Sequence, residues 1–273
     1  MKTAKGKASV AIHTVLGIMA AVWAFPLLFT VFNSFKGQAE YNLGNFWDLP
    51  KGNELFRNIQ YLSKNAGLFS GVLNSLLYAA CGALLAVFIA LLAAYALTHL
   101  PIKRRMFWFL FIYSGTIFPF QVYLIPIYKG YSALGLYNTK LGMILFYMAI
   151  CIPFAMFVLR NFLLGVSDEI CEAAKIDGAG SWGILTRIMM PMAVAPLSVV
   201  FMTQFSWCWN DLMFGLTFTK SPNMRPVMAS LSMMGTKQLP ALLLACLVAS
   251  VPTILTFLTL QRNIESGFVY VGK

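Results

Sequence analysis

The sequence predicts an all-α membrane protein with six transmembrane helices, on the basis of its composition and the spacing of its charges. Of the 273 residues, 59% are hydrophobic and only 11% are charged, and the mean hydropathy is +0.75. An ordinary soluble domain has about 25% charged residues, so this chain has too few charges to cover a globule in water. Intrinsic disorder is excluded because it requires low hydrophobicity.

Six uncharged stretches are long enough to cross a bilayer, which takes about 20 mostly apolar residues. We expect one helix in each: 8–35, 70–97, 106–128, 141–159, 188–210 and 238–261. The first stretch follows three lysines, as a signal peptide would, but its apolar core is too long and no small-residue cleavage site closes it. We therefore expect a retained helix. Prolines deeper in the later stretches predict kinks, at Pro119, Pro126, Pro153, Pro196 and Pro252.

The basic residues predict the orientation of the chain. With six spans both termini lie on one side, and the twenty Lys and Arg residues divide eleven to nine between the sides, which decides little. The cluster Lys103, Arg104 and Arg105 lies in the shortest loop, and basic residues close to helix ends favour the cytoplasm. Together with the N-terminal lysines, this cluster predicts cytoplasmic termini and an extracytoplasmic loop over 36–67.

The segment 160–191 between the fourth and fifth spans carries a dense group of charges and reads as two short helices. Ser167 can cap the first helix, Gly178 and Gly180 can end it, and Ser181 can cap the second. Small and apolar side chains on the first helix suit docking into a groove of another protein. A connector lying on the membrane surface would show the same pattern, so both interpretations remain open.

The sequence shows no arrangement typical of catalysis or of metal binding. Its five cysteines form no C-x-x-C pair, its two histidines have no paired carboxylate, and no P-loop occurs. A G-x-G-x-x-G match at 178–183 lacks the βαβ unit that a dinucleotide site requires. The net charge of +11 is spread among apolar segments, so nucleic-acid binding is not expected.

Residues 172–191 resemble the EAA signature of the membrane subunits of bacterial ABC importers. That signature is E-A-A, three residues, G, nine residues and I-x-L-P; here Met190 replaces the leucine, a swap that conserves volume. Shorter segments resemble the carbohydrate branch, specifically the second permease of the maltose-transporter type: 74–76, 94–97, 124–126, 134–139 and 209–211. The resemblance covers residues 74–261.

The resemblance implies the type I ABC importer permease fold, in a multi-pass subunit of the bacterial cytoplasmic membrane. Residues 1–69 would hold the N-terminal tail, first helix and outer loop, residues 70–262 the core with the EAA loop at 167–191, and residues 263–273 a cytoplasmic tail. The implied partners are a second homologous permease, two ATPase subunits that bind ATP and Mg²⁺, and an extracytoplasmic solute-binding protein. The chain itself would be a transport subunit without a cofactor and not an enzyme.

The resemblance also assigns the first short helix as the coupling helix, seated in a cleft of the ATPase. The implied coupling residues are Glu172, Ala173, Ala174, Asp177, Gly178, Ile188 and Pro191. The implied solute is a mono- or oligosaccharide; a polyol or glycerol phosphate is an alternative. A secondary transporter, which would need carboxylates at mid-membrane, and a structural membrane protein are rivals of another class.

Polar and aromatic residues in or near the spans are candidates for the translocation path, because sugars stack on aromatic rings and hydrogen-bond to amides and carboxylates. Asp211 is the one acid at the end of a span, and ionisable groups at membrane depth are functional candidates. A helix-end residue facing water is the alternative for Asp211. The candidates are Asn74, Gln121, Gln204, Trp207, Asn210 and Asp211.

Overall fold

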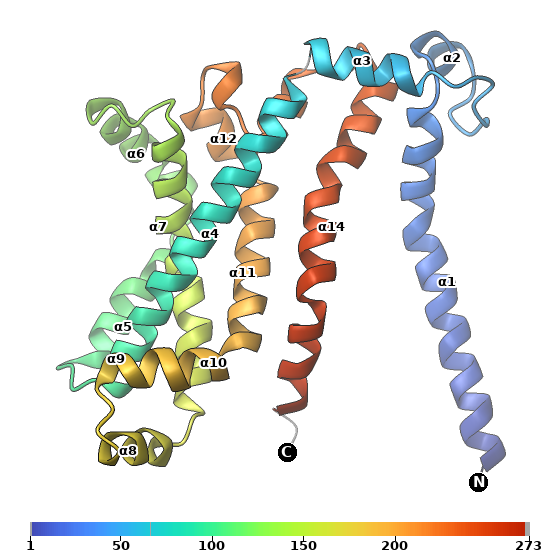
Figure 1. Ribbon diagram of the computed structural model, residues 1–273. Helices are drawn as coiled ribbons and strands as arrows, with labels where there is room; N and C mark the ends of the chain where they lie inside the picture. Colours follow the sequence, from blue (N-terminus) through green and yellow to red (C-terminus); the bar gives the residue numbers. More distant parts are fainter. Residues whose placement is uncertain (1, 66, 271–273) are drawn as a thin grey trace. The chain divides into compact units, whose positions relative to one another are not determined.

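The computed structural model describes residues 2–65 and 67–270, and every regular element in these ranges is a helix (Figure 1). Within them, four helices are long and apolar enough to cross a membrane: Ile12–Ser34, Leu68–His99, Lys140–Leu164 and Leu239–Gln261. Two bent helix pairs bring the number of spans to six if each pair counts as one. The chain forms two compact units: unit 1 holds the residues up to 68 together with 231–250, and unit 2 holds 69–230 and the residues from 251 onward.

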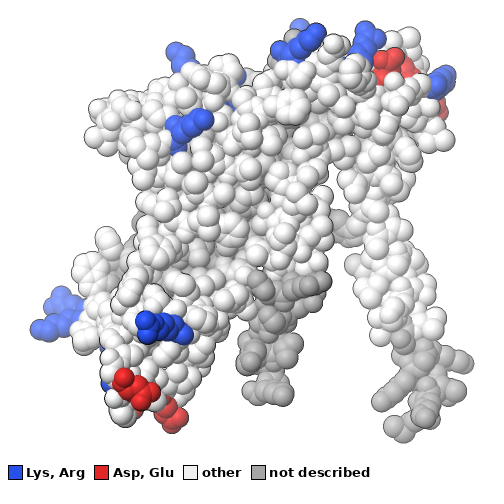
Figure 2. All heavy atoms as spheres, in the orientation of Figure 1, with Lys and Arg blue, Asp and Glu red and all other residues white. Residues whose placement is uncertain are grey.

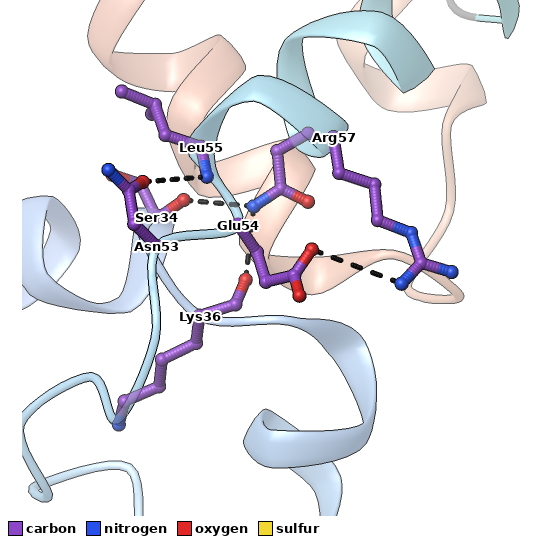
Figure 3. A network of polar contacts seen from close by, with 7 residues as sticks. Ser34, Lys36, Asn53, Glu54, Leu55 and Arg57 are labelled. Atoms are coloured by element: carbon purple, nitrogen blue, oxygen red, sulfur yellow. Dashed lines mark hydrogen bonds and ion pairs between the residues drawn. The ribbon is translucent and has the colours of Figure 1, made fainter.

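Unit 1 contains α1 (Lys2–Ser34), α2 (Gln38–Leu43), α3 (Leu55–Asn65) and the first part of α14 (Leu239–Tyr270). The carbonyls at the end of α1 are satisfied by Asn58 of α3, whose amide donates to the oxygens of Ser34 (2.9 Å) and Lys36 (3.0 Å; Figure 3). This matters because the last carbonyls of a helix have no partner inside it.

Lys36 is buried, with only 1% of its surface exposed. Its ammonium donates to the carbonyl oxygens of Asn45 (3.2 Å) and Phe46 (3.4 Å), which holds the segment that follows α2 against the end of α1. The exposed pair of Glu54 and Arg57, 3.9 Å apart (Figure 3), adds little stability because water screens it.

The core of unit 2 is built on α4 (Leu68–His99), α7 (Lys140–Leu164) and α11 (Val194–Trp209), which run side by side in Figure 1. One face of α4 is lined by fully buried alanines, at 79, 83, 86, 90 and 94, and small side chains let neighbouring backbones approach closely. The helices α7 and α11 also meet through two buried thiols, with the sulfur atoms of Cys151 and Cys208 3.6 Å apart.

Shorter elements connect these helices. The first bent pair is α5 (Arg105–Tyr113) with η1 (Ser114–Thr116), followed by α6 (Gln121–Ala133). The connection between α7 and α11 holds α8 (Asp168–Ile176), α9 (Ser181–Ile184), the π-helical turn η2 (Leu185–Met189) and α10 (Met190–Met192). The connection between α11 and α14 holds α12 (Met213–Phe218), η3 (Pro222–Met224) and α13 (Val227–Met233). In Figure 1, α8 and α9 lie at one end of α7, and α6 and α12 lie at the other.

Kinks were predicted in the stretches 106–128 and 188–210, and both contain a sharp bend; the one at Pro119 is where it was predicted, whereas the second precedes Pro196, which lies inside α11. The first pair bends by 93° at a break that contains Pro119, and the second bends by 76° at Ala193. A π-helical turn and Pro191 precede the second bend, and both features disturb the ladder of backbone hydrogen bonds that keeps a helix straight. Pro126, Pro153 and Pro252 lie inside continuous helices.

The charges of unit 2 gather at its two ends. On the face shown in Figure 2, Lys and Arg are drawn at both ends of this unit, Asp and Glu only at the end that holds α8, and the surface between the two ends is uncharged. Along α7, the only charged residues are Lys140 at its first position and Arg160 near its end. An uncharged belt between charged ends is what a bilayer requires.

Gly82 of α4 gives a test of the close approach between α4 and α7. A Cβ atom at this position would lie 2.7 Å from the Cβ atom of Tyr147, whereas Gly130 of α6 has open space around it. Alanine in place of a helical glycine stabilises a helix by about 1 kcal/mol, but overpacking costs about 1–3 kcal/mol. Gly82→Ala should therefore lower the unfolding midpoint of the purified protein in detergent, and Gly130→Ala should not. Equal midpoints for the two variants would contradict the packing.

Candidate functional site

The helix α8 is closed at both ends by local interactions. At its start, the Ser167 hydroxyl accepts a hydrogen bond from the amide of Glu169 (3.3 Å), and the acids in the first turn suit the positive end of the helix dipole. At its end, Gly178 has a φ of +84°. The amide of Ala179 donates to the carbonyl of Ala174 (2.9 Å) and that of Gly178 to Lys175 (3.0 Å), which is the Schellman arrangement. The predicted cap and stop are confirmed.

One side of α8 is anchored on the core of unit 2 and the other is free. Cys171 and Ala174 are buried in the cluster that includes Ile184 and Leu185, and burial raises the pKa of the Cys171 thiol. Ala174, predicted to let a partner approach, thus faces the chain's own core. From position 172 to 178 the exposed residues are Glu172, Ala173, Lys175, Ile176, Asp177 and Gly178. Ile176 is the most exposed large apolar side chain of α8, at 86%.

The second short helix differs from the prediction. Ser181 is the first residue of α9 and not its cap; Gly180 occupies the capping position, without a side-chain hydrogen bond. The helix continues through η2 and α10, where Ile188 is half-buried and Pro191 is exposed. The EAA residues therefore lie on one continuous structure from α8 to α10, at one end of unit 2 (Figure 1).

Three candidate path residues lie together where α11 ends. The Asp211 carboxylate accepts hydrogen bonds from the Tyr147 hydroxyl (2.9 Å) and from the amides of Gly215 (3.0 Å) and Phe214 (3.3 Å). It therefore joins α7 to the first turn of α12. Trp207 and Asn210 are exposed beside it. Sequence reasoning missed Tyr147, since nothing local connects two residues 64 positions apart.

The other three candidates lie elsewhere. The buried Asn74 amide donates to the carbonyls of Asn223 (2.8 Å) and Arg225 (3.1 Å), and the buried Gln204 amide donates to that of Cys151 (3.1 Å). Both side chains hold neighbouring backbone in place. Gln121 is exposed at the start of α6.

Hydrogen bonds attach the segment 219–227 to the rest of unit 2 at two places. On α4, the Ser75 hydroxyl accepts from the amide of Val227 (2.8 Å) and the Tyr78 hydroxyl donates to the carbonyl of Met224 (3.0 Å), beside the contacts of Asn74. Before α7, the side-chain oxygen of Asn138 accepts from the amides of Lys220 (2.8 Å) and Ser221 (2.9 Å). Asn138 has a φ of 58°, which asparagine tolerates better than most residues.

Within the described residues, no group of three or more His, Cys, Asp or Glu side chains could hold a metal ion. Unit 2 thus has three notable features: the half-exposed helix α8 at one end, the Asp211 carboxylate with the exposed Trp207 and Asn210 beside it near the other end, and the segment 219–227, which hydrogen bonds hold in place.

Residues 82–270 match the model of the family described as binding-protein-dependent transport system inner membrane component. The probable ABC transporter permease YurM of Bacillus subtilis is 32% identical, over 97% of this chain and 89% of the relative. The diacetylchitobiose uptake permease NgcG of Streptomyces coelicolor is 27% identical, over 93% of this chain and 85% of the relative. The arabinooligosaccharides permease AraQ of Halalkalibacterium halodurans is 27% identical, over 93% and 92%.

A chain of a bacterial ABC transporter involved in the import of the acidic polysaccharide alginate has the same fold, with a TM-score of 0.79 over 93% of this chain and 95% of that chain, at 19% identity. The chain belongs to the binding-protein-dependent transport system inner membrane component family. It is therefore a permease subunit of an ABC importer, and the resemblance drawn from the EAA signature is confirmed.

A variant of Asn138 tests how the segment 219–227 is held in place. Asn138→Gly keeps the left-handed backbone accessible but removes the side-chain hydrogen bonds to Lys220 and Ser221, each of which contributes about 0.5–1.5 kcal/mol. Because 1.4 kcal/mol is a factor of ten, tryptic cleavage after the exposed Lys220 should become about tenfold faster. Asn223→Ala is the control, since Asn74 binds only the backbone carbonyl of Asn223. Cleavage at the wild-type rate in Asn138→Gly would show that other contacts hold the segment.

Proposed function

We propose that this permease imports a carbohydrate through the bacterial cytoplasmic membrane, together with a second homologous permease. A solute-binding protein delivers the sugar from outside, and two separate ATPase subunits bind ATP and Mg²⁺ and drive alternating access. Relatives named for diacetylchitobiose and arabinooligosaccharides support a saccharide. A crystal structure with a similar fold, at a TM-score of 0.66, contains an alginate pentasaccharide-bound periplasmic protein, which is the kind of partner proposed here.

The observation that carries the proposal is the half-free helix α8. Its buried side fixes the helix to the core through Cys171 and Ala174, and its Schellman turn sets where the chain leaves. The exposed side presents Glu172, Ala173 and Asp177 to a partner. A helix that is rigidly attached to the core can transmit a displacement imposed on its outer face. We therefore assign α8 as the contact through which the ATPase moves the permease.

The same proposal fixes the topology. In this proposal each bent pair is one span, both termini and α8 lie in the cytoplasm, and the segments 36–67 and 220–237 lie outside. Residues 1–69 form the entry helix and outer segment, 70–262 the core, and 263–273 the cytoplasmic tail; α14 continues to Tyr270, and residues 271–273 lie outside the described residues. A secondary transporter is disfavoured because none of the spanning helices carries an acidic residue within its span.

Two variants test the coupling role of α8. Glu172→Lys reverses a charge on its exposed face, and Gly178→Val forces a β-branched residue into the left-handed region. Each should lower co-purification of the ATPase and ATP-driven sugar uptake by at least about tenfold, since a mispaired charge at an interface costs about 2–5 kcal/mol. The matched control is Gly180→Val, because Gly180 has an ordinary φ of −74° and open space around it. Normal uptake by Glu172→Lys and Gly178→Val would refute the coupling role.

A labelling experiment tests the topology. In a background without Cys81 and Cys246, Glu172→Cys should react with a membrane-impermeant maleimide in inside-out vesicles only. Native Cys171 next to it should stay unlabelled, because it is buried and its pKa is raised, so little of the reactive thiolate is present. Lys51→Cys, at an exposed position of the outer segment, should react in right-side-out vesicles only. The reverse pattern would invert the proposed orientation.

A further inference from the structure

Trp207 is an open aromatic ring on an otherwise packed turn of α11. It is 37% exposed, whereas its neighbours Phe205, Cys208 and Trp209 are at most 3% exposed. Within the described part of the chain, its indole N–H donates to no acceptor, although its ring packs on aromatic neighbours. An N–H group left unpaired in hydrocarbon is costly. We therefore expect the indole N–H of Trp207 to face a polar partner, such as a solute, and not the lipid.

Asn210 supplies an acceptor on the same face, three residues further along the helix. Its amide nitrogen donates to the carbonyl of Ser206 (2.8 Å), and its side-chain oxygen is left for another partner. Thr203, four residues before Trp207, is also exposed. A free donor beside a free acceptor matches a hydroxyl group, which both donates and accepts.

The Trp207 ring is held in place from behind. Its centroid lies 6.2 Å from that of Phe214, 6.3 Å from that of Tyr147 and 6.5 Å from that of Phe120. Tyr147 is fixed in turn by its hydrogen bond to Asp211. The open side of the ring is thus presented in a defined orientation, and a rigid ring binds without losing rotamer freedom.

The charges near this surface exclude one class of solute. Asp211 makes no ion pair among the described residues, and α4 and α11 contain neither Lys nor Arg. Along α7, nineteen uncharged residues separate Lys140 from Arg160. An anion passing Trp207 would therefore lie near a carboxylate that has no ion-pair partner among the described residues, in a region of low dielectric where like charges repel strongly.

We propose that Trp207 and Asn210, with Asp211 behind them, form a contact site for an uncharged sugar ring. The apolar face of the ring stacks on Trp207, and its hydroxyls bond the indole N–H and the Asn210 oxygen. Sugar acids and glycerol phosphate are rejected because of the uncompensated carboxylate, and linear polyols bind poorly because they have no ring face. This inference rests on the proposed import of a carbohydrate and names its chemical class.

The test uses the complete transporter, with its second permease, ATPases and binding protein, in proteoliposomes. The probes are neutral disaccharides (maltose, cellobiose, diacetylchitobiose and arabinobiose), digalacturonate, sorbitol and glycerol 3-phosphate. At least one neutral disaccharide should be taken up, and neither anion. Trp207→Ala should lower that uptake at least tenfold, Trp207→Phe should retain at least a third of it by keeping the stacking face, and Asn210→Lys should lower it at least fivefold.

Two controls separate a local effect from misfolding or loss of coupling. Trp23→Ala removes an exposed tryptophan on α1, far along the chain from Trp207, and should leave uptake unchanged. ATPase stimulation by the binding protein should stay within twofold of wild type in Trp207→Ala, which shows an assembled transporter.

The outcomes distinguish the two proposals. Absence of ATP-driven uptake, or of a bound ATPase, would overturn the proposed function. ATP-driven uptake that prefers an anion or sorbitol, that includes no neutral disaccharide, or that is unchanged in Trp207→Ala would overturn the sugar-ring site and leave the coupling of ATP hydrolysis to transport intact.

Discussion

The structure depends on one constraint: inside a bilayer every backbone polar group must find its partner within the protein. The long helices meet this requirement by themselves, but their ends and the bent segments between them do not. Where the chain leaves the long helices, in the segments that the proposed topology puts outside the bilayer, side-chain amides pair with these backbone groups, at Asn58, Asn74 and Asn138. Each of these side chains forms hydrogen bonds with two backbone groups of a segment other than its own. These buried or half-buried asparagines therefore hold separate segments of the chain together.

Asp211 obeys the same rule and also changes its surroundings. Its carboxylate closes the first turn of α12 and binds Tyr147 of α7, so a single charged side chain joins three elements. Because its hydrogen bonds are directed into the protein, the open groups beside it are those of Trp207 and Asn210. A solute at this surface would therefore meet an uncharged donor, the indole N–H of Trp207, and an uncharged acceptor, the side-chain oxygen of Asn210. The negative charge of Asp211 lies behind them.

Local signals in the sequence predicted much of this architecture. The charge-free windows gave the long helices, and Ser167 and Gly178 gave both ends of α8, because caps and left-handed turns depend on neighbouring residues alone. The hydrogen-bonded pairs Tyr147–Asp211 and Asn138–Ser221 could not be predicted from local sequence, because 64 and 83 positions separate their members. The burial of Lys36 was also missed, because a count of charges assumes that each one faces water, whereas this ammonium is solvated by two carbonyls.

The alanine face of α4 has a mechanical consequence. Bulky side chains on facing helices interlock, so that relative movement requires them to change rotamer. The buried alanines at 79, 83, 86, 90 and 94 carry only methyl groups, so this face of α4 has no large side chains that protrude between those of its neighbour. A neighbouring helix can slide along such a surface by about 1–2 Å while it remains in van der Waals contact. This face of α4 would therefore allow the helix movements that alternating access requires.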